Sequence, residues 1–321
     1  MNGYIEERKF EKAKTLLDAL APWSGNIKSD DFIFRGHSDK NYLLAPTSIR
    51  KDSIDSIWEY SKAYVEIAGS PRDNDFSLAF VEYQLIRDFY RGADVRGLQV
   101  PTSERLRKRL HQKVDFQTMA DWVDGEKWLP SDILEVAALA QHYGIPTRLL
   151  DWTYDPFVAA FFASKPSDRK PRDLCIWGLN ATSIGTFDSV LKDFPLKLIT
   201  PHYSGNPNLA AQSGLFTHWA HVVPGLKTLS SGEVKALPAV DRRPLDVVLK
   251  EYLLKLPNES QDLPAMFIKW TLPASESLEL ARLLRDFGYG PGKLFPGYEG
   301  VAMELKERPF FPRKKLDGQV N

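Results

Sequence analysis

Apolar residues recur along the chain with two spacings, and each spacing predicts a different kind of element. Between about residues 56 and 125 they recur every three or four positions, which is the period of an amphipathic helix. The segments at 173–179 and 265–273, DLCIWGL and AMFIKWTLP, are short and rich in β-branched and aromatic residues, as central strands are. LKLIT at 196–200 is a further candidate strand. The pattern therefore predicts an α+β protein.

Capping residues and glycines predict a helix, a strand and a second helix in succession. A D-x-x-E capping signal begins at Asp132, and Gly144 ends the helix that it starts. The next apolar segment, TRLLDWT at 147–153, lies between two prolines and is too short for a helix, so we expect a buried strand. Asp155 and Pro156 then suit the N-cap and the first position of a short apolar helix, PFVAAFFAS.

Strands are expected on both sides of the helical block, so one mixed sheet assembled around a helical insertion is the simplest arrangement. No repeat period and no linker composition divides the chain. A final amphipathic helix, SESLELARLLRDFG, follows the last strand, with Ser275 as its cap. We predict an N-terminal helical extension over residues 1–30, one domain over 31–306 with its helical insertion at about 56–125, and a C-terminal tail over 307–321.

Composition places the chain among folded proteins of the reducing compartment. Its 321 residues include 42 Lys and Arg against 42 Asp and Glu, and 43% are hydrophobic, so it can bury a full core. The single Cys175 excludes an intramolecular disulfide and a multi-cysteine zinc site, and we expect a cytoplasmic protein. No apolar run approaches the ~18 residues of a membrane span, so no membrane partner is expected. The neutral net charge argues against a protein that coats nucleic acid.

Familiar motifs for phosphate loops, metal sites and acyl-enzyme chemistry are not supported. The glycines of GYGPGK fit neither dinucleotide nor P-loop spacing. His218 and His221 have the spacing of two ligands on a helix face, but no nearby acid or thiol completes a metal site, so hydrogen-bonded imidazoles are the favoured interpretation and no metal is expected. Cys175 falls inside a predicted buried strand, where a thiol is more often inert packing than a nucleophile.

A basic segment, SERLRKRLHQK at 103–113, has two interpretations. Arg105, Lys108 and Arg109 lie within reach of one helix face, where they would neutralise several phosphates. Such charges more often form the solvated surface of a helix, and that interpretation is favoured.

Three short segments mix polar groups with apolar neighbours: FRGH at 34–37, QHYGIPTRLLDWT at 141–153 and LAAQSGLFTHW at 209–219. Arg35 stands at the end of a predicted buried strand, where an unpaired guanidinium costs several kcal/mol. Arg35 therefore has either a carboxylate partner or a ligand. Gly36 directly after it would let a ligand approach the backbone closely.

The second of these segments places several polar groups where they can line one cleft. Asp151 and Thr153 are two residues apart on the predicted strand and share a face, which Arg148 joins only if the strand is irregular. His142 ends the preceding helix, and the turn after it leads back to the same strand. The structural alternative is an internal ion pair of Asp151 with Arg148 or with Arg35.

The three segments resemble the FRG-domain family, which takes its name from the Phe-Arg-Gly that stands here at 34–36. YLLAPTSIR, QHYGIPTRLLDWTYDPFVAAFFA, LAAQSGLF and LFPGYEGVAMEL extend the resemblance over about residues 31–306. The last of them departs from the family at two positions, because Glu299 stands where an aspartate is usual and Gly297 replaces an acidic residue. Family members occur in bacterial and phage genomes, often in contexts that suggest conflict, so the resemblance implies a defence or toxin effector.

The order of the segments is also similar to that of ADP-ribosyltransferases, which implies a fold of that kind. In those enzymes a strand ending in Arg or His beside a small residue precedes a strand with Ser or Thr and a short helix. By this resemblance Arg35 would pair with a dinucleotide phosphate, and Thr153 would organise the nicotinamide pocket. A late Glu or Gln would steer the acceptor, and Gln212 and Glu299 both stay open for this place.

These resemblances imply a site directed at NAD or another nucleotide, with transfer or hydrolysis as its reaction. The catalytic candidates are Arg35, His142, Asp151, Thr153 and Gln212, and the candidates for binding the nucleotide are Arg35, Gly36 and Arg148. We expect NAD as a substrate, no obligatorily bound cofactor, and nucleic acid or protein as the acceptor. One alternative is a module that holds the phosphate of a nucleotide or nucleic acid without turnover. Another is a buried polar network that only fixes the fold, with the function on the helical block. An open cavity among the candidates would favour a site, and side chains that satisfy each other with no void would favour the network.

Overall fold

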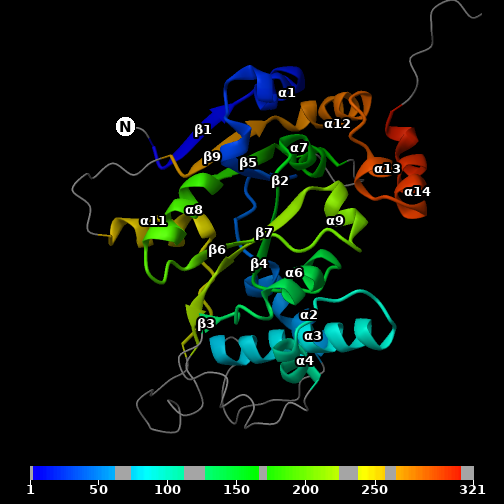
Figure 1. Cartoon of the computed structure of the whole chain (residues 1–321). Helices are drawn as coiled ribbons and strands as arrows, with labels where there is room; N and C mark the ends of the chain where they lie inside the picture. The colour runs from blue at the N-terminus through cyan, green and yellow to red at the C-terminus, as the bar shows by residue number, and fades with distance from the viewer. Residues whose placement is uncertain are drawn as a thin grey trace, which may run out of the picture.

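A seven-stranded mixed sheet forms the centre of the computed structural model, in the order β1-β9-β5-β2-β4-β7-β6 (Figure 1). The structure describes residues 3–61, 74–111, 127–165, 172–223, 238–256 and 265–311. The strands of the sheet are β1 (Ile5–Lys9), β2 (Phe32–His37), β4 (Leu149–Thr153), β5 (Leu174–Asn180), β6 (Leu196–Ile199), β7 (Gly214–Trp219) and β9 (Phe267–Leu272). β1 is parallel to β9, and the other neighbours are antiparallel. The predicted α+β class, with one mixed sheet, is confirmed.

Helices cover both faces of this sheet and one of its ends (Figure 1). Those packed on one face are α1 (Ala13–Leu20), α7 (Pro156–Ser164), α12 (Ser277–Asp286) and α13 (Pro291–Leu294), and those on the other are α8 (Ala181–Val190) and α11 (Leu245–Leu254). The remaining helices are α2 (Ile54–Ser61), α3 (Asp75–Val95), α4 (Glu104–His111), α6 (Leu134–His142), α9 (Pro207–Ala211) and α14 (Tyr298–Glu307). No helix in the described ranges is both long and apolar enough to cross a lipid bilayer.

Alternate residues of the central strands pack into two separate hydrophobic cores, one on each face of the sheet. Phe34 and Ile176 face α1, α7 and α12, whereas their neighbours Ile33, Cys175 and Trp177 face α8 and α11. A strand that is buried on both faces has no polar face, which is why DLCIWGL reads as a continuous apolar run. The third core lies at the end of the sheet, where α3, α4 and α6 pack against β4 and β7.

The helical insertion and the chain ends agree only in part with the sequence-based expectations. Helices are found at 54–61, 75–95 and 104–111, the described residues 96–103 are not helical, and 62–73 and 112–125 lie outside the described residues. So does most of the expected tail, from 312 onward. The N-terminal extension was expected to be helical, but it also contributes β1 to the sheet. An edge strand with the sequence IEERK exposes most of its side chains, so apolar periodicity could not reveal it.

The predicted succession of helix, strand and helix is confirmed in α6, β4 and α7. Gly144 follows α6 with φ +87°, a conformation that glycine adopts without strain. Asp155 caps α7 by accepting a hydrogen bond from the amide of Phe157 at 2.8 Å, and Pro156 fills the first turn, where no amide donor is needed.

Two predicted helix caps are wrong. Helix α6 begins at Leu134 without a side-chain cap, because Asp132 instead forms ion pairs with Arg105 and Arg109 of α4. Helix α12 begins at Ser277, and Ser275 lies inside the 3-10 turn that precedes it. Both residue types are ambiguous signals, because aspartate also forms ion pairs and serine also stabilises local turns.

Candidate functional site

Strands β2 and β4 separate in the middle of the sheet. β2 pairs with β5 from Phe32 to His37, but its ladder with β4 consists of the single pair Phe34 and Thr153. Beyond this pair the side chain of Arg35 bridges the two strands, because its Nη1 donates a hydrogen bond to the main-chain oxygen of Asp151 at 2.6 Å. A guanidinium thus takes the place of the next backbone hydrogen bonds in the ladder.

A cavity of about 520 Å³ opens where the two strands separate, and we call it the Arg35 pocket. Its walls come from β2, β4, α6, α7 and the turn between α9 and β7, and they include all five predicted catalytic candidates, Arg35, His142, Asp151, Thr153 and Gln212. The volume falls in the range of sites that bind small molecules. Side chains from four separate segments therefore converge around an open cavity.

The carboxylate of Asp151 is held by two side chains while it stays accessible. Its Oδ2 accepts hydrogen bonds from Arg35 Nη1 and from Gln141 Nε2, both at 3.3 Å, and the side chain is 49% exposed. Asp151 is the single acidic residue among the described residues that line the pocket. The alternative of an internal Arg35–Asp151 ion pair is thus present, but the pair faces a cavity and is not sealed.

His37, which the sequence analysis did not select, fixes the position of Arg35. Its Nε2 lies 3.0 Å from Nε of Arg35. An arginine Nε carries a hydrogen and cannot accept one, so Nε2 of His37 is unprotonated and the neutral ring carries its proton on Nδ1. Burial and the neighbouring Arg35 charge lower the pKa of His37 to about 3. The sequence could have predicted this contact, because His37 stands two residues after Arg35 and so shares its face of the strand.

Arg50 is a second guanidinium in the pocket, and it was also missed. Its Nε and Nη2 donate to the main-chain oxygen of Ala45 at 2.9 and 2.8 Å. Burial lowers the pKa of Arg50, and the positive charge of Arg35 lowers it further. No carboxylate of the described chain lies within ion-pair distance of Arg50. The signal in the sequence was the segment YLLAPTSIR, which carries part of the family resemblance and ends at this residue.

His142 presents a neutral imidazole to the pocket. Burial lowers its pKa, and the nearby Asp151 carboxylate offsets this only in part. Near neutral pH the ring is therefore unprotonated.

Thr153 and Gln212 hold the pocket walls together. The Thr153 hydroxyl donates to the main-chain oxygen of Gln212 at 2.7 Å and accepts from the amide of Asp155 at 3.0 Å. The Gln212 side chain in turn donates to the main-chain oxygen of Leu294 at 3.0 Å. Glu299, the other candidate for the late position, lies exposed on α14 and is not among the lining residues. Of the two candidates, the structure places Gln212 at the pocket.

The family model of the FRG domain matches residues 30–172. The chain carries an FRG domain. The match contains β2, α6, β4 and α7, whereas LAAQSGLF and LFPGYEGVAMEL follow it, so the expected domain limit at residue 306 stays a prediction. No curated protein and no solved structure matches the chain.

Gly36 of the FRG domain serves the packing of a helix. A Cβ at this position would lie 1.9 Å from the main-chain oxygen of Ala159 and 2.8 Å from the amide nitrogen of Ala163, both in α7. Gly36 does line the pocket, but the space that its missing side chain leaves is filled by the helix backbone. The expectation that Gly36 lets a ligand approach is therefore wrong. The missing side chain lets α7 pack against β2.

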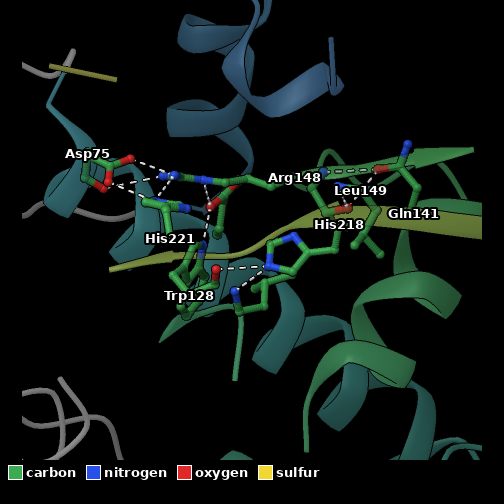
Figure 2. Close-up of polar contacts among 10 residues, drawn as sticks. Asp75, Trp128, Gln141, Arg148, Leu149, His218 and His221 are labelled. Atoms are coloured by element: carbon green, nitrogen blue, oxygen red, sulfur yellow. Dashed lines mark hydrogen bonds and ion pairs between the residues drawn. The ribbon is translucent and has the colours of Figure 1, made fainter. Parts of the chain in front are cut away.

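Arg148, the third predicted binding residue, lies within the family match but does not line the Arg35 pocket. Figure 2 shows its side chain beside Asp75 and His221. Its Nε contacts Glu82 Oε2 at 2.7 Å, and its Nη1 contacts a carboxylate oxygen of Asp75 at 2.5 Å and Nε2 of His221 at 2.6 Å. The side chain is buried and already shared by two carboxylates, so it has no charge left for a phosphate. Arg148 instead fastens α3 to the start of β4.

The two histidines considered as metal ligands lie on strands, not on a helix. Nε2 of His218 is 2.8 Å from the amide nitrogen of Leu129, and Nε2 of His221 is 2.8 Å from the carboxylate of Asp75. Burial lowers the pKa of His218 to about 3, so this ring is neutral. In the described ranges no three His, Cys, Asp or Glu side chains are grouped as metal ligands.

Cys175 is buried, and the three basic side chains of helix α4 considered as phosphate ligands have carboxylate partners. Burial raises the pKa of the Cys175 thiol to about 12, so the thiol stays protonated. On α4, Arg105 and Arg109 are paired with Asp132, and Lys108 contacts Glu104 at 2.7 Å. The described part of this segment, 103–111, is a helix surface with internal partners, and 112–113 lie outside the described residues.

Proposed function

We propose that the Arg35 pocket binds the phosphate of a nucleotide, with NAD as the substrate, and that it transfers or hydrolyses the ADP-ribosyl group. The observation that carries the proposal is the convergence of the five candidates around one cavity together with a second guanidinium, that of Arg50. The resemblance in segment order to ADP-ribosyltransferases supports the choice of NAD.

The charges of the pocket favour an anion. Arg35 and Arg50 supply two positive charges, and the nearby Asp151 supplies one negative charge that is partly in water. The Arg35 charge lowers the pKa of Arg50, which means that the two guanidiniums repel each other. A phosphate placed between them would relieve this repulsion and accept charge-assisted hydrogen bonds.

Two side chains have properties that suit cleavage at the ribose. In this reaction the bond between C1′ and the nicotinamide nitrogen breaks, the nicotinamide leaves with the electron pair, and positive charge develops on the ribose. The Asp151 carboxylate would stabilise that charge. The neutral ring of His142 would accept the proton of the water or hydroxyl group that forms the new bond to C1′.

The test combines calorimetric NAD binding with an assay for released nicotinamide. Arg50→Gln removes the unpaired charge, and Asp151→Asn preserves the shape of the side chain while removing its charge. Arg282→Ala on the exposed face of α12 is the matched control, because among the described residues Arg282 forms only surface ion pairs, with Glu279 and Asp286. We expect Arg50→Gln to weaken binding, Asp151→Asn to abolish release with binding retained, and Arg282→Ala to match the wild type. Wild-type protein that neither binds NAD nor releases nicotinamide would exclude the proposal.

A binding module without turnover is the second candidate function, and one observation favours it. The hydroxyl proton of Thr153 and the amide of Gln212 are engaged in internal hydrogen bonds, so neither is free to act on a substrate. Nucleotide binding that depends on Arg50, with no release of nicotinamide in the presence of acceptors, would identify this function.

The family resemblance adds a role in conflict to the proposal. A toxin or defence effector of this kind would slow the growth of cells that express it. Growth unaffected by the wild type would contradict the toxin role. Growth slowed equally by Asp151→Asn would show that the toxicity does not depend on the pocket chemistry.

A further inference from the structure

A second hollow, of about 580 Å³, adjoins the Arg35 pocket. Its walls are formed by the chain between Asn41 and Asp52 together with Arg242, and we call it the Leu43 hollow. Tyr42 and Arg50 line both this hollow and the Arg35 pocket. The two spaces therefore meet at one aromatic and one cationic side chain.

The Leu43 hollow combines apolar surface with positive charge. Its cationic side chains are those of Arg50, Lys51 and Arg242, its acid is Asp52, and its apolar side chains include Leu43, Ala45 and Ile49. Leu43 is 59% exposed, so its apolar surface is accessible to a ligand in the hollow. Apolar contact for a base and nearby cations for a phosphate are what a nucleotide site requires.

The boundary between the two spaces is suited to phosphate. Arg50 donates hydrogen bonds from Nε and Nη2 to the main-chain oxygen of Ala45, and these bonds hold the guanidinium in place. Within the described chain its Nη1 has no acceptor. The Tyr42 ring is 48% exposed and stands edge-on to the His37 ring, with centroids 6.0 Å apart. A fixed cation and a partly exposed ring thus stand where a ligand would pass from one space to the other.

We propose that the ligand is a dinucleotide that occupies both spaces: one nucleoside in the Arg35 pocket, the other in the Leu43 hollow, and the pyrophosphate at Arg50. The inference rests on the proposed function and deepens it, because it assigns a second subsite. Two hollows that share one cationic side chain fit two units joined by phosphate. A polynucleotide would need a longer basic track, whereas the chain balances 42 basic with 42 acidic residues.

The test is a calorimetric comparison of NAD, ADP-ribose, nicotinamide mononucleotide and oligothymidylates of increasing length. We expect NAD and ADP-ribose to bind at least about tenfold more tightly than the mononucleotide, because a second nucleoside adds contacts. Leu43→Ser and Lys51→Glu should weaken NAD binding by about fivefold and leave the mononucleotide unaffected. Lys14→Glu, on the exposed face of α1, is the matched control and should change neither.

Different negative results would distinguish failure of the second subsite from failure of the proposed function. A mononucleotide that binds as tightly as NAD, together with wild-type affinities for the Leu43 and Lys51 variants, would overturn the second subsite while the Arg35 pocket stands. Oligothymidylates that outcompete NAD, with affinity rising with their length, would overturn the dinucleotide as the ligand. Absence of any nucleotide binding by the wild type would overturn the proposed function itself. Leu43 and Lys51 are both exposed, so their variants are expected to fold, and thermal unfolding checks this.

Discussion

Replacing Gly36 with alanine tests why β2 and α7 lie so close together. The new Cβ would be 1.9 Å from the oxygen of Ala159, whereas ordinary contact begins at 3.4 Å, so a shift of about 1.5 Å is needed. The obstacles are backbone atoms of α7, which cannot rotate away as a flexible side chain does. The helix must therefore move as a unit.

The cost of that movement follows from what α7 covers. Val158, Phe161 and Ala163 of this helix are buried in one core together with Trp270. Moving the helix away would open gaps along this contact, and overpacked cores lose about 1–3 kcal/mol, occasionally more. Because the displaced atoms belong to a backbone with little freedom, we expect a loss of about 3 kcal/mol, at the upper end of this range.

Urea denaturation followed by circular dichroism measures this loss. A decrease of about 3 kcal/mol corresponds to a midpoint lowered by about 1 M urea or more. Gly185→Ala in α8 is the matched control, because a Cβ there meets nothing within 4 Å, and helix propensity predicts a gain of about 0.5–1 kcal/mol. A Gly36→Ala protein with wild-type stability would refute the packing account. Wild-type stability with loss of nucleotide binding would restore Gly36 to the ligand.

Three further predictions concern buried ionisable groups. Arg148→Ala should lower the free energy of unfolding by about 3–5 kcal/mol, because two buried carboxylates lose their counter-charge, and nucleotide affinity of the folded protein should be unchanged; loss of affinity without loss of stability would contradict this. Acidification should destabilise the protein: the pKa values of His37 and His218 are lowered to about 3, so below about pH 6.5 the unfolded state binds more protons. The free energy of unfolding, measured by urea denaturation, should be about 3 kcal/mol lower at pH 5.5 than at pH 7.5. His218→Asn should reduce this difference to roughly half. Cys175 should resist iodoacetamide in the native protein and react after unfolding, because its thiol is buried and its pKa raised to about 12; rapid native labelling would argue otherwise.

Elements with local signals were predictable from the sequence. Gly144, Asp155 and Pro156 act within one or two turns of chain, so α6, β4 and α7 could be placed from neighbouring residues alone. β1 could not be placed, because its assignment depends on β9, more than 250 residues away, and its own side chains are mostly exposed. Strand pairing at an edge is a property of the partner as much as of the strand.

The site was predictable where polar residues interrupt apolar segments, and less so elsewhere. Arg35 and Asp151 stood out for this reason, and both line the pocket. Arg148 carried the same signal, but its acidic partners lie 66 and 73 residues away in the chain, where sequence offers no way to pair them. Arg50 lies outside any strand or helix with apolar periodicity, so nothing but the family resemblance marked its segment.

The separation of β2 from β4 also decides how the domain can be cut. β5, the strand that pairs along all of β2, begins at Leu174, just after the end of the family match, and Gln212 and Phe295 complete the far wall of the pocket. A fragment trimmed to 30–172 would leave β2 paired with β4 at a single position and the Arg35 pocket open on one side. A graft of this domain onto another protein should therefore extend at least through Phe295, the residue that follows α13.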